Sequence, residues 1–327
     1  MGISMFVKKK PNPVFVGMFV CIILAFLVTL GGFSFLRKQM AKIQPEETKG
    51  QTYRAHYAFI VEDSEDEYWN RVYEAAKEEG KKQDIYVEKI ADNITENYTV
   101  KEYLDIALAE KVDGILLQSS SKSVGEAMDK AMDLGIPVVT MLHDNYSGRR
   151  CAFVGVNESS LGETYAKLIQ ENLSGSKKRI LVLLEDGGEM GHNNLAIQVL
   201  RKRMPKETIQ IKELPVGDDF GTEKVVRECI LDDQICPDIL VCLSLSSTIY
   251  AYEAVVDYSK VGTVKILGAY ENDEIRRALD KNIMAATIDI APETIGQRAI
   301  KAIKEYKENG FVNEYQMVEE KVIRGNK

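Results

Sequence analysis

A short acidic segment, residues 62–69, carries the side chains best suited to hold a small molecule. It follows an apolar run at 58–61 with the composition of a strand and leads into residues 67–79, whose spacing is that of a helix. Five carboxylates come directly before Tyr68 and Trp69, the only tryptophan of the chain. Two large aromatic side chains at such a turn either pack between strand and helix or form the floor of a binding site.

Patterns typical of catalysis are missing from the sequence. No serine lies in a GxSxG motif, and no cysteine has a plausible histidine partner. The three histidines, His56, His143 and His192, lack metal-ligand spacing, so the sequence predicts no metal site. Residues 185–194, EDGGEMGHNN, lack GxGxxG, and their acidic side chains would repel a phosphate. We therefore expect no cofactor and no enzyme activity, with an enzyme on the same fold as the less favoured alternative.

Composition narrows the class of protein further. The 327 residues are 45% apolar and 28% charged, as in globular chains, and allow two domains of ordinary size. A net charge of -8 and a pI near 5.2 argue against nucleic acid as a partner, because phosphates need a basic face. Cys229 and Cys236 could pair in an oxidising compartment, but we expect reduced, buried thiols.

The amino-terminal region predicts a membrane anchor. Residues 14–36 contain no charge over 23 positions, and a bilayer core of about 30 Å needs about 20 apolar residues in a helix. The run is longer than the apolar stretch of a cleavable signal, and no small residue precedes Cys21 as a lipoprotein would require. We expect residues 1–13 in the cytoplasm, an uncleaved anchor at 14–36 and a tether at 37–52.

The rest of the chain alternates short apolar runs with helix-period stretches, which predicts parallel βαβ units. The pattern restarts after residues 151–157, so we expect an α/β fold of two doubly wound, Rossmann-like lobes joined by a hinge and preceded by one transmembrane helix. Ligands of such sheets bind outside the carboxyl ends of the strands, and two facing sheets would form a cleft. The predicted strands are 55–62, 84–91, 113–118, 136–142, 179–185, 209–216, 238–244, 265–270 and 285–290, and the predicted helices are 67–79, 98–110, 123–134, 159–173, 192–203, 220–231, 247–258, 273–280 and 292–307.

Several motifs occur in an order and at spacings that together carry a family resemblance. They are EYWNRVYEAAKEEG (67–80), KVDGILLQ (111–118), LGIPVVTM (134–141), FVGVNESSLG (153–162), TIYAYEAVVDYSKVGTVKILGAYENDEI (248–275) and ATIDIAPETIG (286–296). From about residue 53 to 327 the chain resembles the type I periplasmic sugar-binding proteins, the ribose- and galactose-binding superfamily that includes the core of LacI-type repressors. The resemblance implies one binding lobe from 53–155 plus 291–316 and a second from 156–290 plus 317–327.

The resemblance also implies where a ligand would bind, with two aromatic side chains that sandwich a sugar ring. The positions that match the family's ligand contacts are Asp66, Tyr68, Trp69, His143, Asp144, Asn157, Asn193, Ser246, Ser247, Tyr270, Glu271 and Asp289.

Several family residues are replaced at those positions. Leu142 replaces the acid that the family has first after the fourth strand. Asn193 replaces the family's arginine in the second lobe, and Tyr270 replaces a further acid. Without those charge-assisted contacts, a plain pentose or hexose is less favoured than a neutral polyol, an amino sugar or another cationic ligand. Sugar phosphates are disfavoured, and loss of tight binding is an alternative.

Taken together, the sequence predicts a membrane-tethered, extracytoplasmic binding protein that closes two lobes on a small, carbohydrate-like ligand. Its partner would be either the membrane permease of an ABC-type importer or a sensor histidine kinase. A sensing accessory protein without a transport role is the alternative.

Overall fold

The computed structural model describes residues 52–94, 98–173, 179–185, 194–204, 208–215 and 218–325. The predicted anchor at 14–36, the segment 1–13 and the tether up to residue 51 lie outside this part of the chain. In the described ranges, no helix has both the length and the apolar character that a membrane span requires.

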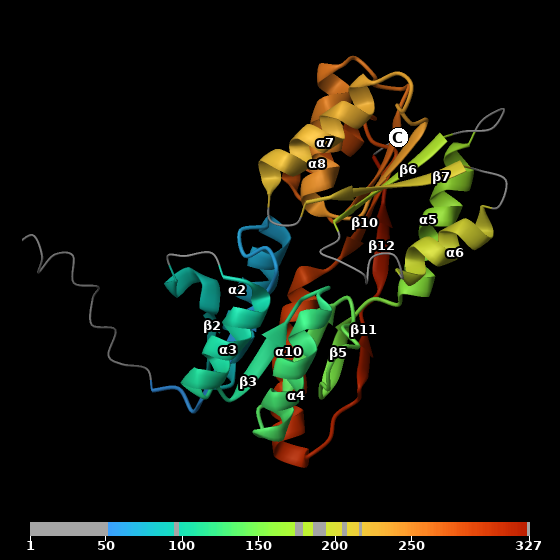
Figure 1. Ribbon diagram of the computed structural model, residues 1–327. Coiled ribbons are helices and arrows are strands. Elements are labelled where there is room, and N and C mark those ends of the chain that lie inside the picture. The colour runs from blue at the N-terminus through green and yellow to red at the C-terminus, as the bar shows by residue number, and fades with distance from the viewer. Residues whose placement is uncertain are drawn as a thin grey trace, which may run out of the picture. The chain divides into compact units, whose positions relative to one another are not determined.

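The first lobe is built on a six-stranded parallel sheet, in the order β11-β5-β4-β3-β1-β2 (Figure 1). Its strands are β1 (Ala55–Ile60), β2 (Ile85–Lys89), β3 (Gly114–Leu117), β4 (Val138–Leu142), β5 (Ala152–Gly155) and β11 (Tyr315–Met317). Its helices are α2 (Glu67–Lys82), α3 (Val100–Glu110), α4 (Gly125–Asp133) and α10 (Pro292–Asn309), with 3-10 turns η1 (Ile90–Asn93) and η2 (Lys122–Val124).

Both faces of this sheet are buried, and β1 shows how. Tyr57 and Phe59 pack in the cluster that contains residues of α2 and α10, whereas Ala58 and Ile60 pack in the cluster formed with α3 and α4. Successive side chains of a strand point to opposite faces, so a strand covered on both sides reads as a continuous apolar run. Figure 1 shows α10 lying across the strands of this lobe.

The second lobe repeats the arrangement in the order β12-β10-β9-β8-β6-β7, with β12 antiparallel to β10. Its strands are β6 (Arg179–Glu185), β7 (Thr208–Leu214), β8 (Ile239–Cys242), β9 (Lys265–Ala269), β10 (Ala286–Ile290) and β12 (Glu320–Ile323). Its helices are α5 (Glu158–Asn172), α6 (Leu195–Arg203), α7 (Asp219–Leu231), α8 (Leu245–Asp257) and α9 (Asp273–Asp280). The prediction of two α/β lobes is confirmed, and the short strands β5, β11 and β12 were not predicted.

The chain passes between the sheets three times: after Gly155, after Ile290 and between Met317 and Glu320. These crossings place α10 and β11 with the first sheet and β12 with the second. The division into two moving bodies at these crossings stays a prediction. Cys229 and Cys236 are free, buried thiols.

Candidate functional site

A cavity of about 250 Å³ lies between the two lobes, at the carboxyl ends of strands from both sheets. This is the place at which parallel α/β sheets bind ligands. From the first lobe it is lined by Glu62, Asp63, Asp66, Tyr68, Trp69, Gln118, Ser119, Ser120, Leu142, His143, Asp144 and Tyr146. From the second lobe it is lined by Glu158, Leu161, Tyr165, Leu184, Asn194, Ala196, Leu243, Ser244, Leu245, Ala269, Tyr270, Ile288 and Ile290.

Glu62 organises the polar wall of the first lobe. Its Oε1 accepts hydrogen bonds from Ser119 Oγ (2.8 Å), the Ser120 amide (2.7 Å) and Ser120 Oγ (3.0 Å). Its amide donates to Gln118 Oε1 at 2.9 Å. Glu62 follows β1 and the other three residues follow β3, and these strands are neighbours, so the carboxyl ends of both strands meet here.

The acidic turn before α2 is fixed by its own backbone. Asp66 caps the helix, because its side chain accepts from the Trp69 amide at 3.1 Å. Asp63 Oδ1 accepts from the amides of Glu65 and Asp66. Burial raises the pKa of Asp63, and the negative charge of Asp219 in the second lobe raises it further, against the lowering effect of those amides.

The predicted aromatic pair lines the cavity and is also packed. Tyr68 stacks on Tyr270 of the second lobe with ring centroids 3.9 Å apart, and its hydroxyl donates to the Ile290 carbonyl at 3.0 Å. Trp69 meets the Tyr68 ring edge-on at 5.4 Å. The two residues are only 1% and 8% exposed, so they are packed and also line the cavity, and their role as the floor of a binding site stays a prediction.

Two lining residues adopt a left-handed backbone that non-glycine residues rarely use. Leu142 has φ 66° and Tyr270 has φ 62°. They stand at the ends of β4 and β9, which hold the same place in the two sheets. Such conformations persist where surrounding structure enforces them, commonly at binding sites.

Asp144 and His143 have different environments. Asp144 is buried and bound by Thr140 Oγ1 at 2.8 Å and by two nitrogens of Arg150, one of them at 2.6 Å. His143 is half-exposed, and its Nδ1 lies 3.4 Å from Glu158 Oε1 in the other lobe. Burial raises the pKa of Glu158, but the bond and charge of His143 and the Leu195 amide outweigh it, so that pKa is lowered.

On one side of the cavity, polar contacts also connect the lobes. Arg71 donates from α2 to the Glu271 carbonyl at 2.7 Å, and Asn272 donates to Glu67 at 2.9 Å. These contacts hold the amino end of α2 beside the loop that follows β9.

Five predicted residues do not line the cavity. Asn157 caps α5 by accepting from the Ser160 amide, and Ser247 is buried in the capping box of α8, where Ser246 is its neighbour. Glu271 pairs with Arg276 outside the cavity. Asp289 lies between the lining residues Ile288 and Ile290, so its side chain takes the other face of β10, where its buried Oδ1 has no hydrogen-bond partner. Asn193 lies outside the described residues.

Sequence reasoning missed several lining residues, chiefly Glu62, the run 118–120, Tyr165 and Glu158. Tyr165 donates to the carbonyls of Cys242 and Gly268, both at 3.2 Å, from the middle of α5. Polar residues directly after a strand, as in QSSS, are the pattern that could have identified the run 118–120.

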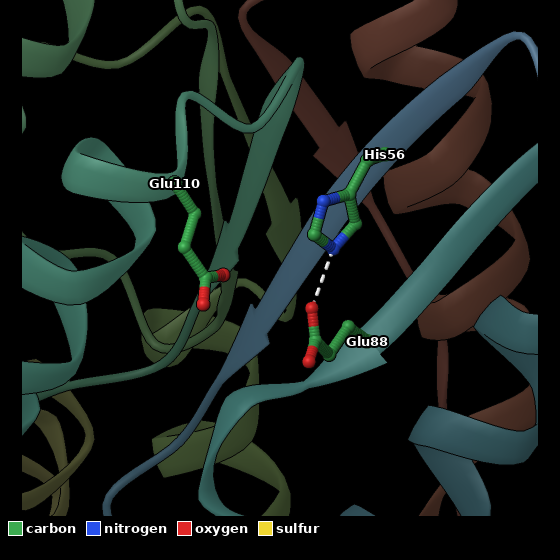
Figure 2. Close-up of side chains that lie close together, drawn as sticks. All are labelled: His56, Glu88 and Glu110. Atoms are coloured by element: carbon green, nitrogen blue, oxygen red, sulfur yellow. Dashed lines mark ion pairs between the residues drawn. The ribbon is translucent and has the colours of Figure 1, made fainter. Parts of the chain in front are cut away.

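Among the described residues, one group has metal-ligating side chains close together: His56, Glu88 and Glu110 (Figure 2). His56 Nε2 lies 2.6 Å from Glu88 Oε2, without the alignment of a hydrogen bond. Glu88 Oε1 accepts from Asn93, and Glu110 is exposed. A contact between the His56 ring and the Glu88 carboxylate on neighbouring strands accounts for this geometry, and it lies away from the cavity-lining residues. The absence of a metal site stays a prediction.

Comparisons with known proteins agree with this architecture. The solved structure of GanP, a glucose-galactose binding protein from Geobacillus stearothermophilus, is 23% identical with a TM-score of 0.69, covering 83% of this chain and 97% of its own. A solved XylFII-LytSN complex contains a chain 21% identical, with a TM-score of 0.68 and coverages of 83% and 97%. A solute-binding protein from Burkholderia graminis, in complex with D-arabinose, is 16% identical with a TM-score of 0.72 and coverages of 84% and 96%. These likenesses show the fold.

No curated protein matches the sequence significantly. The model of a periplasmic binding protein domain matches residues 57–310, most of the chain. With two α/β lobes around a cavity and this match, the chain belongs to the periplasmic binding protein family, a family of non-enzymatic binding proteins.

Proposed function

We propose that this chain is an extracytoplasmic binding protein that closes its two lobes on a small carbohydrate-like ligand. The observation that carries the proposal is the cavity of about 250 Å³ enclosed by the carboxyl ends of both sheets. Pockets for drug-sized ligands measure roughly 300–1,000 Å³, so this volume suits a ligand of monosaccharide size.

The lining supplies the two kinds of contact that a sugar needs. The rings of Tyr68, Trp69 and Tyr270 offer apolar faces for C–H groups. Carboxylate, hydroxyl and amide groups of Glu62, Ser120 and Gln118 offer acceptors and donors for ring hydroxyls. We propose ligand contacts for the predicted residues that line the cavity, namely Asp66, Tyr68, Trp69, His143, Asp144 and Tyr270.

Closure would follow from contacts that only a closed state makes with the ligand from both lobes. The stack of Tyr68 on Tyr270 and the bond from Arg71 to Glu271 keep the lobes together on one side of the cavity. Bending at the three crossings would then open and close the other side, where His143 faces Glu158.

Residues 14–36 would anchor the protein in the membrane, with the two lobes outside the cytoplasm. Such an anchor keeps a partner at high effective concentration, which suits either an importer's permease or a sensor kinase. Both uses find support among structural neighbours, one described as a sugar ABC transporter's sugar-binding protein and one solved in complex with LytSN.

A thermal-shift screen of monosaccharides and their amino derivatives tests the proposal. It uses residues 53–327 fused to a solubility tag and is repeated on the full chain in detergent. A true ligand raises the melting temperature, and the rise grows with the logarithm of its concentration above Kd. The carbohydrate assignment is wrong if pentoses, hexoses and their amino derivatives all leave the melting temperature unchanged at millimolar concentration.

A further inference from the structure

The cavity carries an excess of negative charge. Five of its lining residues are carboxylic acids, and none of the described lining residues is a lysine or an arginine. Asp144 is neutralised by Arg150 behind it, and Glu158 faces His143. The other three acids, Glu62, Asp63 and Asp66, all belong to the first lobe.

Glu62 and Asp63 are bound only by neutral groups among the described residues. The donors to Glu62 are the side chains of Gln118, Ser119 and Ser120 and one backbone amide. The donors to Asp63 are two backbone amides. Hydrogen bonds from neutral donors hold a carboxylate in place but leave its charge uncompensated.

The second lobe contributes one more negative charge near Asp63. Asp219, at the start of α7, does not line the cavity, but burial and its charge together raise the pKa of Asp63. Like charges that approach as the lobes close repel one another, and a cation between them removes that repulsion. Tyr68 and Trp69 also line the cavity, and aromatic rings attract cations at their faces.

We propose that the cavity takes a polyhydroxylated ligand bearing a protonated amine, an amino sugar or an imino sugar, in preference to the neutral sugar of the same shape. This rests on the proposed function and specifies its ligand class. The ammonium group carries a positive charge, three donors and no acceptor, so it complements a wall whose carboxylates at Glu62 and Asp63 have no positively charged partner in the described part of the chain. It would bind at Glu62 and Asp63, while ring carbons contact the aromatic side.

Isothermal titration with matched sugars tests the proposal. The probes are D-glucose, D-glucosamine and N-acetyl-D-glucosamine, the corresponding galactose series, and the imino sugar 1-deoxynojirimycin, at pH 7 and low salt. We expect at least one charged member to bind about tenfold or more tightly than its neutral parent, since hydrogen bonds to charged groups are about twice as strong as neutral ones. Acetylation, which removes the charge, should abolish the advantage.

Two cavity variants test whether Glu62 and Asp63 cause the preference for the charged sugar. Glu62→Gln and Asp63→Asn should each weaken binding of the charged sugar more than binding of its neutral parent, so that the ratio of charged to neutral affinity falls severalfold, by up to about tenfold. Glu65→Gln removes the same charge from an exposed neighbour outside the cavity and should preserve the ratio. Circular dichroism and melting of each variant establish that it is folded.

The outcomes separate this inference from the proposed function. Neutral sugars that bind as tightly as, or more tightly than, their amino derivatives overturn the cationic preference and leave the carbohydrate function standing. Absence of binding by every charged and neutral probe overturns both. A charged preference that survives in both cavity variants shows that Glu62 and Asp63 are not its source.

Discussion

The ring of Tyr68 stacks on the ring of Tyr270 across the two lobes, at 3.9 Å between centroids and 28° between planes. Tyr68 lies in the first turn of α2, the helix that follows β1, and Tyr270 directly follows β9. The Tyr68 hydroxyl reaches further, to the carbonyl of Ile290, which is the last residue before the chain returns to the first lobe. The Tyr68 side chain therefore lines the cavity, contacts the second lobe and forms a hydrogen bond at a point where the chain crosses between the lobes.

Tyr68→Phe should destabilise the protein while keeping the stack. It removes the hydroxyl that donates to the Ile290 carbonyl at a fully buried position, which costs about 1–3 kcal/mol. Denaturant unfolding measures the change. Tyr73→Phe is the matched control, because Tyr73 donates from the same helix to the Val87 carbonyl through a longer bond of 3.4 Å. Equal losses in both variants would argue against a special role for the bond at the crossing.

Ligand binding should change the fluorescence of Trp69. It is the only tryptophan, it lines the cavity and it is 8% exposed, so its emission reports on this position alone. Trp69→Phe should abolish the response and keep an aromatic face. Trp69→Ala should weaken binding by roughly 1–3 kcal/mol. Because Trp69 is buried, the same substitution should also lower the free energy of unfolding by about 3–5 kcal/mol. A saturating ligand that leaves the emission unchanged would place the binding site elsewhere.

Arg150→Met should be strongly destabilising. Asp144 and Arg150 have side chains only 3% and 8% exposed, and removal of the arginine leaves a buried carboxylate with Thr140 as its remaining partner. Breaking such a buried pair costs about 3–5 kcal/mol. Chemical denaturation of the single variant and of Arg150→Met with Asp144→Asn provides the measurement, and the double variant should recover much of the loss.

The neighbouring Arg149 offers a control for that prediction. Its ion pairs with Asp129 and Asp133 are exposed, so Arg149→Met should cost at most about 1 kcal/mol. If the two arginine variants unfold at the same denaturant concentration, burial does not govern the strength of the Asp144 pair.

The order of strands and helices could be predicted from sequence because each strand is an apolar run and each helix repeats its apolar positions. β6 and α9, for example, agree with the predicted 179–185 and 273–280. The strands β11 and β12 were missed because they are three and four residues long with mostly exposed or intermediate side chains, so no apolar run marks them. The four-residue strand β5 was missed because the run 151–157 that contains it was taken only as the point at which the pattern restarts.

The site was only partly predictable, for two physical reasons. In β10 both faces are covered, so the sequence ATIDI does not say which face holds the cavity, and Asp289 was assigned to it in place of Ile288 and Ile290. Asn157 and Ser247 are polar residues at strand-end loops, but helix capping rather than ligand binding accounts for them. The convergence of residues 118–120 on Glu62 depends on strand order, which one sequence does not display.

Asp63→Asn should stabilise the ligand-free protein at neutral pH. Burial and the charge of Asp219 raise the pKa of Asp63 above its unfolded value of about 3.9. An acid with a raised folded pKa binds protons more readily in the folded state, so its ionisation reduces stability as pH rises through that pKa. The amide keeps an oxygen that can accept from the Glu65 and Asp66 amides, and it removes the charge. We therefore expect a higher melting temperature than wild type at pH 7, with the difference shrinking as pH falls toward the unfolded value, where both side chains are neutral.

Glu65→Gln, which removes an exposed charge two residues away, should show little gain at either pH. The prediction is wrong if the rise in melting temperature persists unchanged in acid, or if Glu65→Gln produces the same rise. Either result would mean that the negative charge of Asp63 does not destabilise the ligand-free protein.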